Sequence, residues 1–265
     1  MKYYFNSRIM FTLLAAVVFG FSINASADNH EGPTSGVAET WVVTVDMGSQ
    51  AAFEEAFKTH MAVREEAGDP ANWQVYTNHT GSNMNTYYIR NCCSQWADFD
   101  AYRSWEEENA NVMADWGANV HPHTSNYGHH YSMVDYVNSH WPGDTEHKFV
   151  GVTTYEIAPG SGQAFDAAKA ELSQAALTGG WSEAGHRWAW SSAVDGENSV
   201  SLAIPHENFA DMAEPDPTLY QFMSKHMGSE EAASESFARF TAAISGSSYK
   251  IYAHRPDLSM SMSDE

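Results

Sequence analysis

The chain has 265 residues, with 34 acidic and 13 basic side chains and a formal charge of −21 at pH 7. A chain this acidic repels nucleic acid and anionic lipid, so we expect neither as a partner. Aromatic residues make up 13% of the chain. Disordered chains are poor in aromatic residues, so this content favours a folded protein with a substantial core.

Residues 1–27 have the pattern of a cleaved export signal. Lys2 and Arg8 come before an apolar run from Ile9 to about Ile23, and Ala25-Ser26-Ala27 supplies small residues at a cleavage site. The run of roughly 15 residues is short for a transmembrane helix, which needs about 20. We therefore predict cleavage after Ala27, a periplasmic or secreted protein, and no membrane attachment afterwards. Residues 28–37 are polar and predict a flexible leader.

Residues 38–142 predict the element order β-α-β-β-α-β. A β-branched run at 41–45 predicts a strand, and apolar residues from Phe53 to Arg64 recur at helical spacing until Gly68-Asp69-Pro70. The next elements are strands at 73–77 and 86–90 around a turn at 81–85, a helix capped by Ser94 and running through Trp116, a His-rich loop at 121–130 and a strand at 131–137.

Residues 147–256 predict the same order again, with a flexible tail at 257–265. The expected elements are strands at 149–157, 186–192, 200–204 and 249–253, a helix from Gly162, and a helical stretch at 209–244 broken near 214–217 and at Gly228. Short segments also match between the halves: Gln50-Ala-Ala-Phe53 with Gly162-Gln-Ala-Phe165, Trp96-Ala-Asp98 with Phe209-Ala-Asp211, and His140-Trp-Pro142 with His254-Arg-Pro256. These matches indicate an internal repeat.

Several predicted strands are apolar or aromatic at both odd and even positions, as in Trp41-Val42-Val43 and Tyr87-Tyr88, which is typical of sheets covered on both faces. One βαββαβ unit covers one face of its sheet with helices, and the other copy can cover the second face. The chain thus resembles the dimeric α+β barrel superfamily over about residues 38–255. That superfamily includes antibiotic-biosynthesis-type and haem-degrading monooxygenases, muconolactone isomerases and stress-responsive proteins. The resemblance implies an α+β fold of two tandem ferredoxin-like βαββαβ units, packed sheet to sheet as an intramolecular dimeric barrel.

The resemblance also implies a ligand site between the sheet and the helices of each half. His60 and His226 lie on otherwise apolar helical faces and are the predicted catalytic residues, since an imidazole in a pocket can act as a base. His60 aligns with Leu172 in the second half. The predicted ligand-binding residues are Trp73, Tyr76, Asn78, Trp188 and Trp190, and a metal-binding pair is predicted at His121 and His123.

Two functions remain open on these grounds. One is an exported protein that binds a small hydrophobic or aromatic molecule, or haem. The alternative is a cofactor-independent, monooxygenase-like enzyme acting on a planar aromatic substrate with a histidine base. The sequence requires no cofactor, although haem or a metal fits the pattern, and a further homo-oligomer is compatible with it. The adjacent cysteines Cys92 and Cys93 are either two buried thiols or a disulfide between neighbours. No phosphate-binding loop, nucleophile elbow or HExxH motif is present.

Overall fold

A computed structural model describes residues 32–143 and 145–261. The predicted export signal and residues 28–31 of the predicted leader lie outside the described residues. The described residues from Pro33 onward form one compact unit. No helix of the described part is long and apolar enough to cross a bilayer.

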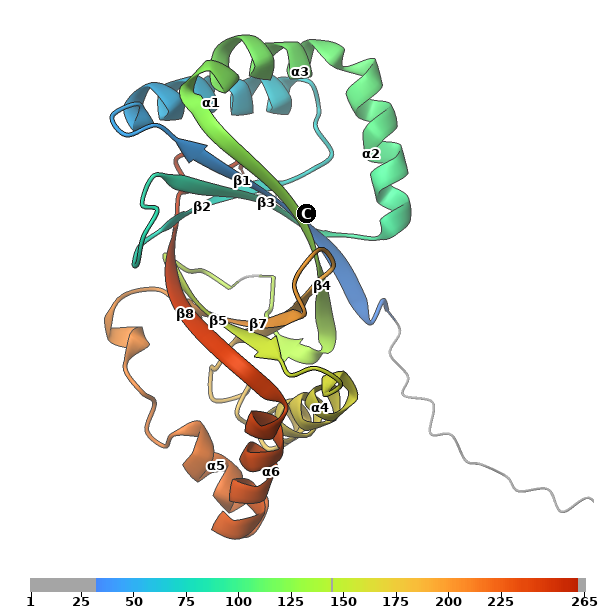
Figure 1. The fold of residues 1–265 in the computed structure, drawn as a ribbon, viewed down its shortest axis with the longest axis vertical. Coiled ribbons are helices and arrows are strands. Elements are labelled where there is room, and N and C mark those ends of the chain that lie inside the picture. The colour runs from blue at the N-terminus through green and yellow to red at the C-terminus, as the bar shows by residue number, and fades with distance from the viewer. Residues whose placement is uncertain (1–31, 144, 262–265) are drawn as a thin grey trace, which may run out of the picture. The chain divides into compact units, whose positions relative to one another are not determined.

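Eight strands close into one barrel, with the helices outside it (Figure 1). The strands are β1 (Ser35–Val45), β2 (Trp73–Asn78), β3 (Thr86–Ser94), β4 (Thr124–His140), β5 (Phe149–Ile157), β6 (Trp188–Ala193), β7 (Ser199–His206) and β8 (Ile244–His254). The helices are α1 (Gln50–Glu66), α2 (Trp96–Glu108), α3 (Ala110–Asp115), α4 (Gly162–Thr178), α5 (Leu219–His226) and α6 (Glu230–Ala242). A π-helical turn (Trp116–Val120) and two 3₁₀ turns (His121–His123 and Ala210–Met212) complete the described helical elements.

The strand order around the barrel is β1-β3-β2-β8-β5-β7-β6-β4. Each half contributes four consecutive strands in equivalent order, β4-β1-β3-β2 and β8-β5-β7-β6. The halves join through two antiparallel seams, β2 with β8 and β4 with β6. This arrangement confirms the predicted α+β class with two βαββαβ units, and closure removes the free sheet edges that each half would otherwise expose.

Two hydrophobic cores lie between the sheet and the helices, one in each half. Phe53 and Phe57 of α1 pack on the first half of the sheet, and Phe165 of α4 packs on the second half. Because side chains alternate along a strand, the residues between these core positions face the barrel interior. Ile89 of β3, for example, belongs to the first core, and its neighbour Arg90 therefore points into the barrel.

The ends of the folded unit differ from the sequence predictions. β1 begins at Ser35, so residues 35–37 belong to a strand and not to the predicted leader, because they pair with β4. The predicted flexible tail is also wrong where the structure describes it. Leu258 and Met260 are only 1% and 6% exposed in the first core, and the Met260 N–H donates to the Trp73 carbonyl at 2.9 Å.

Three local predictions need correction. The His-rich loop is mostly strand, because residues 124–130 pair with β1 as the first part of β4. Ser94 is still part of β3, and α2 is capped by Gln95, whose backbone N–H donates to Asp98 Oδ2 at 2.7 Å. The single helix expected to run through Trp116 breaks at Asn109 into α2 and α3. In each case a tertiary or local hydrogen bond overrode a weaker sequence pattern.

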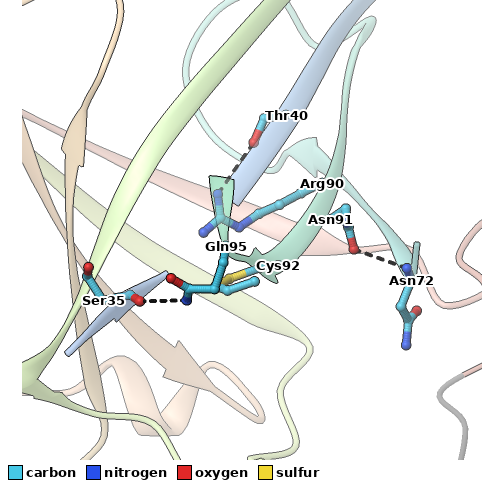
Figure 2. Close-up of a disulfide and its surroundings, with 8 residues drawn as sticks. Ser35, Thr40, Asn72, Arg90, Asn91, Cys92 and Gln95 are labelled. Carbon is cyan, nitrogen blue, oxygen red and sulfur yellow. Dashed lines mark hydrogen bonds between the residues drawn. A yellow bond between two sulfur atoms is a disulfide. The ribbon is translucent and has the colours of Figure 1, made fainter. Parts of the chain in front are cut away.

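Cys92 and Cys93 form a disulfide between neighbouring residues at the end of β3 (Figure 2). Both residues are exposed. Of the two alternatives that the sequence left open, the structure therefore has the disulfide.

Candidate functional site

His60, the first predicted catalytic residue, is fully buried and uses both ring nitrogens. Its Nδ1 lies 2.8 Å from Asp115 Oδ2, and the Arg64 Nε–H donates to its Nε2 at 2.9 Å. This geometry places the ring proton on Nδ1. Burial lowers the pKa of His60, with Asp115 opposing and Arg64 adding to that effect. The imidazole is therefore held neutral, and it can accept a proton only by giving up a hydrogen bond. The arrangement favours a structural role.

Arg64 connects His60 to the predicted ligand residue Trp73. Its Nη1 donates to Asp69 Oδ2 at 2.5 Å and to the Tyr102 hydroxyl at 3.0 Å. The Trp73 indole N–H also donates to Asp69 Oδ2, at 3.2 Å. This network of His60, Arg64, Asp69, Tyr102 and Asp115, referred to below as the His60 network, is a polar brace between α1, α3 and the sheet.

The other predicted ligand residues do not converge on one place. The Asn78 amide donates to two carbonyls of the following turn. The Tyr76 hydroxyl faces His147 Nε2 at 3.1 Å, inside the β2–β8 seam. The buried indoles of Trp188 and Trp190 donate to the Asn138 carbonyl at 2.7 Å and to Ser173 Oγ at 3.0 Å. Their N–H groups are thus satisfied within the protein, as expected for core tryptophans.

His226 is an exposed residue at the end of α5. Its ring lies parallel to Phe222, with the ring centroids 6.1 Å apart. Beneath it the second core is filled by aromatic contacts, including Phe165–Phe240 at 5.1 Å. A cleft at the opposite end of α4, between that helix and β6–β7, measures about 150 Å³, below the roughly 300–1,000 Å³ usual for small-molecule pockets. His226 does not line this cleft.

His121 and His123 lie in a 3₁₀ turn before β4. The His121 ring stacks on Tyr127 at 5.6 Å, and its Nδ1 lies 2.5 Å from the Tyr127 hydroxyl. Within residues 32–143 and 145–261, no group of three or more His, Cys, Asp or Glu side chains is arranged to hold a metal ion. The predicted pair thus has no third ligand of these types in the described part.

A different imidazole has the geometry of a base. His129 of β4 directs Nε2 at Glu39 Oε1 of β1, 2.8 Å away. Glu39 is 3% exposed on the helix-covered face of the sheet. No hydrogen bond to His129 Nδ1 is present among the described residues. A carboxylate that holds one nitrogen and leaves the other free is the arrangement that orients a general base.

Aromatic side chains surround this Glu39–His129 dyad. Trp41 is the cross-strand partner of His129, and the two rings stack at 4.0 Å with planes 11° apart. Tyr131 packs edge-on against His129 at 4.8 Å. Trp96 and Phe99 of α2 lie within 5.5 Å of the Tyr131 ring. The dyad therefore has an apolar aromatic wall formed by β1, β4 and α2.

α2 covers this face loosely. None of its residues is buried, whereas α1 buries five. Trp96 is 49% exposed, and the His129 side chain is 25% exposed. The dyad is therefore partly open to solvent beside α2.

Arg103 of α2 supplies a positive charge near the dyad. Its charge acts to lower the pKa of Tyr131, although burial, the larger effect, raises that pKa overall. Arg103 also donates to Glu106 Oε2 at 2.7 Å. It is placed to stabilise an anion that forms on a molecule beside His129.

Sequence reasoning missed this dyad for an identifiable reason. His129 was assigned to a loop, so its alternation with Tyr127 and Tyr131 on one face of a strand was not used. Glu39 alternates with Trp41 in the same way on β1. Two such alternating segments were a usable signal, but only with the knowledge that the strands are neighbours.

A second cleft lies between α4 and strands β4 and β6, with a volume of about 390 Å³. Lys169 of α4 points its amine at Asp135 Oδ2, 2.9 Å away, and at Asp166 Oδ1, 3.3 Å away. Both charges of the Lys169–Asp135 pair are thus used within the protein. This cleft lacks a free acid–base group comparable with His129.

The fold is shared with solved structures of low sequence similarity. Two structures titled "putative monooxygenase", from Lactobacillus acidophilus NCFM and Fusobacterium nucleatum, match with TM-scores of 0.51 and 0.52 at 10% identity, each covering 84% of this chain and 94% of its own. A mutant chlorite dismutase from Candidatus Nitrospira defluvii matches with a TM-score of 0.50 at 10% identity, over 85% of this chain and 94% of its own. No protein-family model and no curated protein matches the chain. At these identities the likeness shows the dimeric α+β barrel fold alone.

Proposed function

We propose that this protein binds a small planar aromatic molecule at the Glu39–His129 dyad, between the first half of the sheet and α2. The observation that carries the proposal is a partly exposed imidazole with one nitrogen bonded to a buried carboxylate and the other free. The ligand sites of proteins are largely apolar, with a few placed polar groups, and the aromatic wall around the dyad has that composition.

The geometry also indicates which ligand chemistry fits. Tyr131, Trp96 and Phe99 can contact the rings of a planar molecule. His129 Nδ1 can accept a proton from an acidic hydroxyl of that molecule, while Glu39 stabilises the imidazolium that forms. Arg103 then lies near the resulting anion. A phenol or an enolised polycyclic ketone meets all three requirements.

Proton abstraction makes a cofactor-independent, monooxygenase-like enzyme the second candidate function. The dyad itself favours the enzyme over a passive binding protein, because a passive binding site needs no oriented base. His129 would form the electron-rich anion of the substrate, and dioxygen would then react with that anion. His60 serves this role less well, since both of its nitrogens are already bonded.

The decisive experiment uses 4-nitrophenol, whose absorbance reports ionisation. We expect binding to wild type to increase the phenolate fraction at a fixed pH below the phenol's own pKa. His129→Gln should remove that increase, and the exposed control His226→Gln should retain it. An equal phenolate signal in wild type and His129→Gln would contradict the proposal. Oxygen uptake with polyhydroxylated aromatic substrates then separates the enzyme from the binder.

We also propose export, on the basis of the charged, apolar and small-residue segments of residues 1–27. The mature protein should begin at Asp28 and remain soluble after alkaline extraction. N-terminal sequencing tests this directly, and an intact Met1 in the membrane fraction would refute it.

A further inference from the structure

The barrel interior contains a cation on the face of the sheet opposite to the dyad. Arg90 of β3 pairs with Thr40 of β1 on one side and with Gln74 of β2 on the other. These three side chains point inward, because Ile89 next to Arg90 belongs to the core under α1. The residues flanking Arg90 across the strands are thus neutral.

Arg90 lacks a carboxylate partner in the described part of the chain. A guanidinium carries five N–H donors, yet the hydrogen bond found for Arg90 is a long one, from Nη1 to Thr40 Oγ1 at 3.4 Å (Figure 2). Burial lowers the pKa of Arg90, while the Tyr76 and Tyr136 hydroxyl groups act in the opposite direction. A charge enclosed by the barrel wall without a partner is costly, and proteins usually pair such a charge.

Other arginines show that partners were available. Arg64 pairs with Asp69, Arg103 with Glu106, Arg239 with Glu171, and Arg255 with Glu54 and Asp257. The chain has 34 acidic residues, yet none of those that the structure describes forms an ion pair with Arg90. Arg187 also forms no ion pair, but it donates to two backbone carbonyls. Among the arginines that the structure describes, Arg90 thus has neither a carboxylate nor a backbone carbonyl as a partner.

The guanidinium also has room beside it. Its Nε and Nη2 make no hydrogen bond in the described residues. Neither atom is fully buried, and Arg90 as a whole is partly exposed. Its unbonded donors thus face accessible space inside the barrel.

We propose that Arg90 forms a binding site for a small, singly charged, planar anion, namely a low-molecular-weight carboxylate. Two parallel N–H groups of a guanidinium match the two oxygens of a carboxylate. Thr40 and the hydroxyl groups of Tyr76 and Tyr136 supply further polar contacts nearby. One guanidinium in a strongly acidic chain disfavours a phosphate dianion, because the rest of the protein repels multiple negative charge.

The test uses formate as the probe, on the full-length mature protein. At equal ionic strength, sodium formate should raise the thermal midpoint of wild type above its value in sodium chloride, and the rise should saturate. Arg90→Gln should abolish the rise or weaken the apparent affinity at least roughly ten-fold. Arg187→Gln is the matched control, since Arg187 donates to the backbone carbonyls of Ser182 and His186, and it should respond as wild type does.

A second measurement needs no variant and covers the case in which Arg90→Gln does not fold. The NMR line of ¹³C-formate should broaden when wild-type protein is added and sharpen again when excess acetate competes. Phosphate at the same ionic strength should not restore the sharp line. Absence of broadening, or an identical midpoint shift in wild type and Arg90→Gln, would overturn the assignment.

Discussion

The two halves of the barrel have the same order of elements and a different chemistry. In the first half, His60 and Arg64 lie on the inner face of α1 within a polar network. At the matching positions of α4, the second half has Leu172 and Ala176, which pack among aromatic and aliphatic side chains. Both halves therefore share an apolar helical face, with Phe53 on α1 and Phe165 on α4. The His60 network is present in the first half and has no counterpart at the matching positions of α4.

The dyad shows the same asymmetry. In the register that aligns Phe53 with Phe165, Glu39 corresponds to Gly151 and Trp41 to Thr153. A Cβ atom at Gly151 would meet the Tyr249 hydroxyl, so an acidic side chain at this position would require Tyr249 to move. Of the two halves, only the first thus carries a carboxylate–imidazole pair at this place on the sheet.

Arg64→Met should have the largest effect on the free energy of unfolding. It leaves Asp69, whose side chain is 0% exposed, without its counter-charge and removes a hydrogen bond from His60. Breaking a buried pair costs about 3–5 kcal/mol. The control Arg239→Met breaks an exposed pair with Glu171 and should cost far less, because solvent screens exposed ion pairs. Urea denaturation measures both, and similar small losses would show that the His60 network does not brace the first half.

Leu172→His places an imidazole in the second half at the position that matches His60 in the first half. No counterpart of Arg64 stands there to bond the new ring, because that position is Ala176. The unsatisfied polar group should cost about 1–3 kcal/mol, whereas Leu172→Met should cost less than about 1.5 kcal/mol. If thermal denaturation shows no difference between these variants, the second core is more adaptable than its packing indicates.

Acid should destabilise the protein through buried histidines. Burial lowers the pKa of His60 below its ordinary value of 6.5, so the unfolded chain binds a proton that the folded chain rejects. The free energy of unfolding should therefore fall as pH drops below about 6.5, by at most about 1.4 kcal/mol per pH unit for this group. Burial also lowers the pKa values of His147 and His254, which act in the same direction.

His60→Leu isolates the contribution of His60 to the pH dependence of the free energy of unfolding. Urea midpoints between pH 5 and pH 7 should change less steeply in the variant than in wild type, whatever its absolute stability. Leu172, at the matching position of the second half, carries no titratable group. Equal slopes would mean that His60 keeps its ordinary pKa.

Glu39→Gln should have the smallest effect on stability, about 1 kcal/mol, because the amide oxygen can still accept the His129 N–H. It removes the negative charge that stabilises a protonated His129. The phenolate signal with 4-nitrophenol should therefore fall while the melting temperature changes little. A variant that melts far earlier would show that Glu39 has mainly a structural role.

The sequence determined the element order, most helix and strand positions, and the α+β class, because these depend on local periodicity and on breakers such as Gly68 and Gly228. It also marked His60 as an unusual residue on an apolar helical face. Export and the catalytic role of the histidines remain predictions.

Only the tertiary structure decided which polar groups meet. The partners of His60 and His129 are 55 and 90 residues away in the chain, and Arg90 faces the interior because the barrel closes around it. Local patterns report which residue types lie on one face of an element. Strand pairing and barrel closure bring distant faces together. For this reason the dyad, the partners of the His60 network and the unpaired guanidinium could not be predicted from spacing alone.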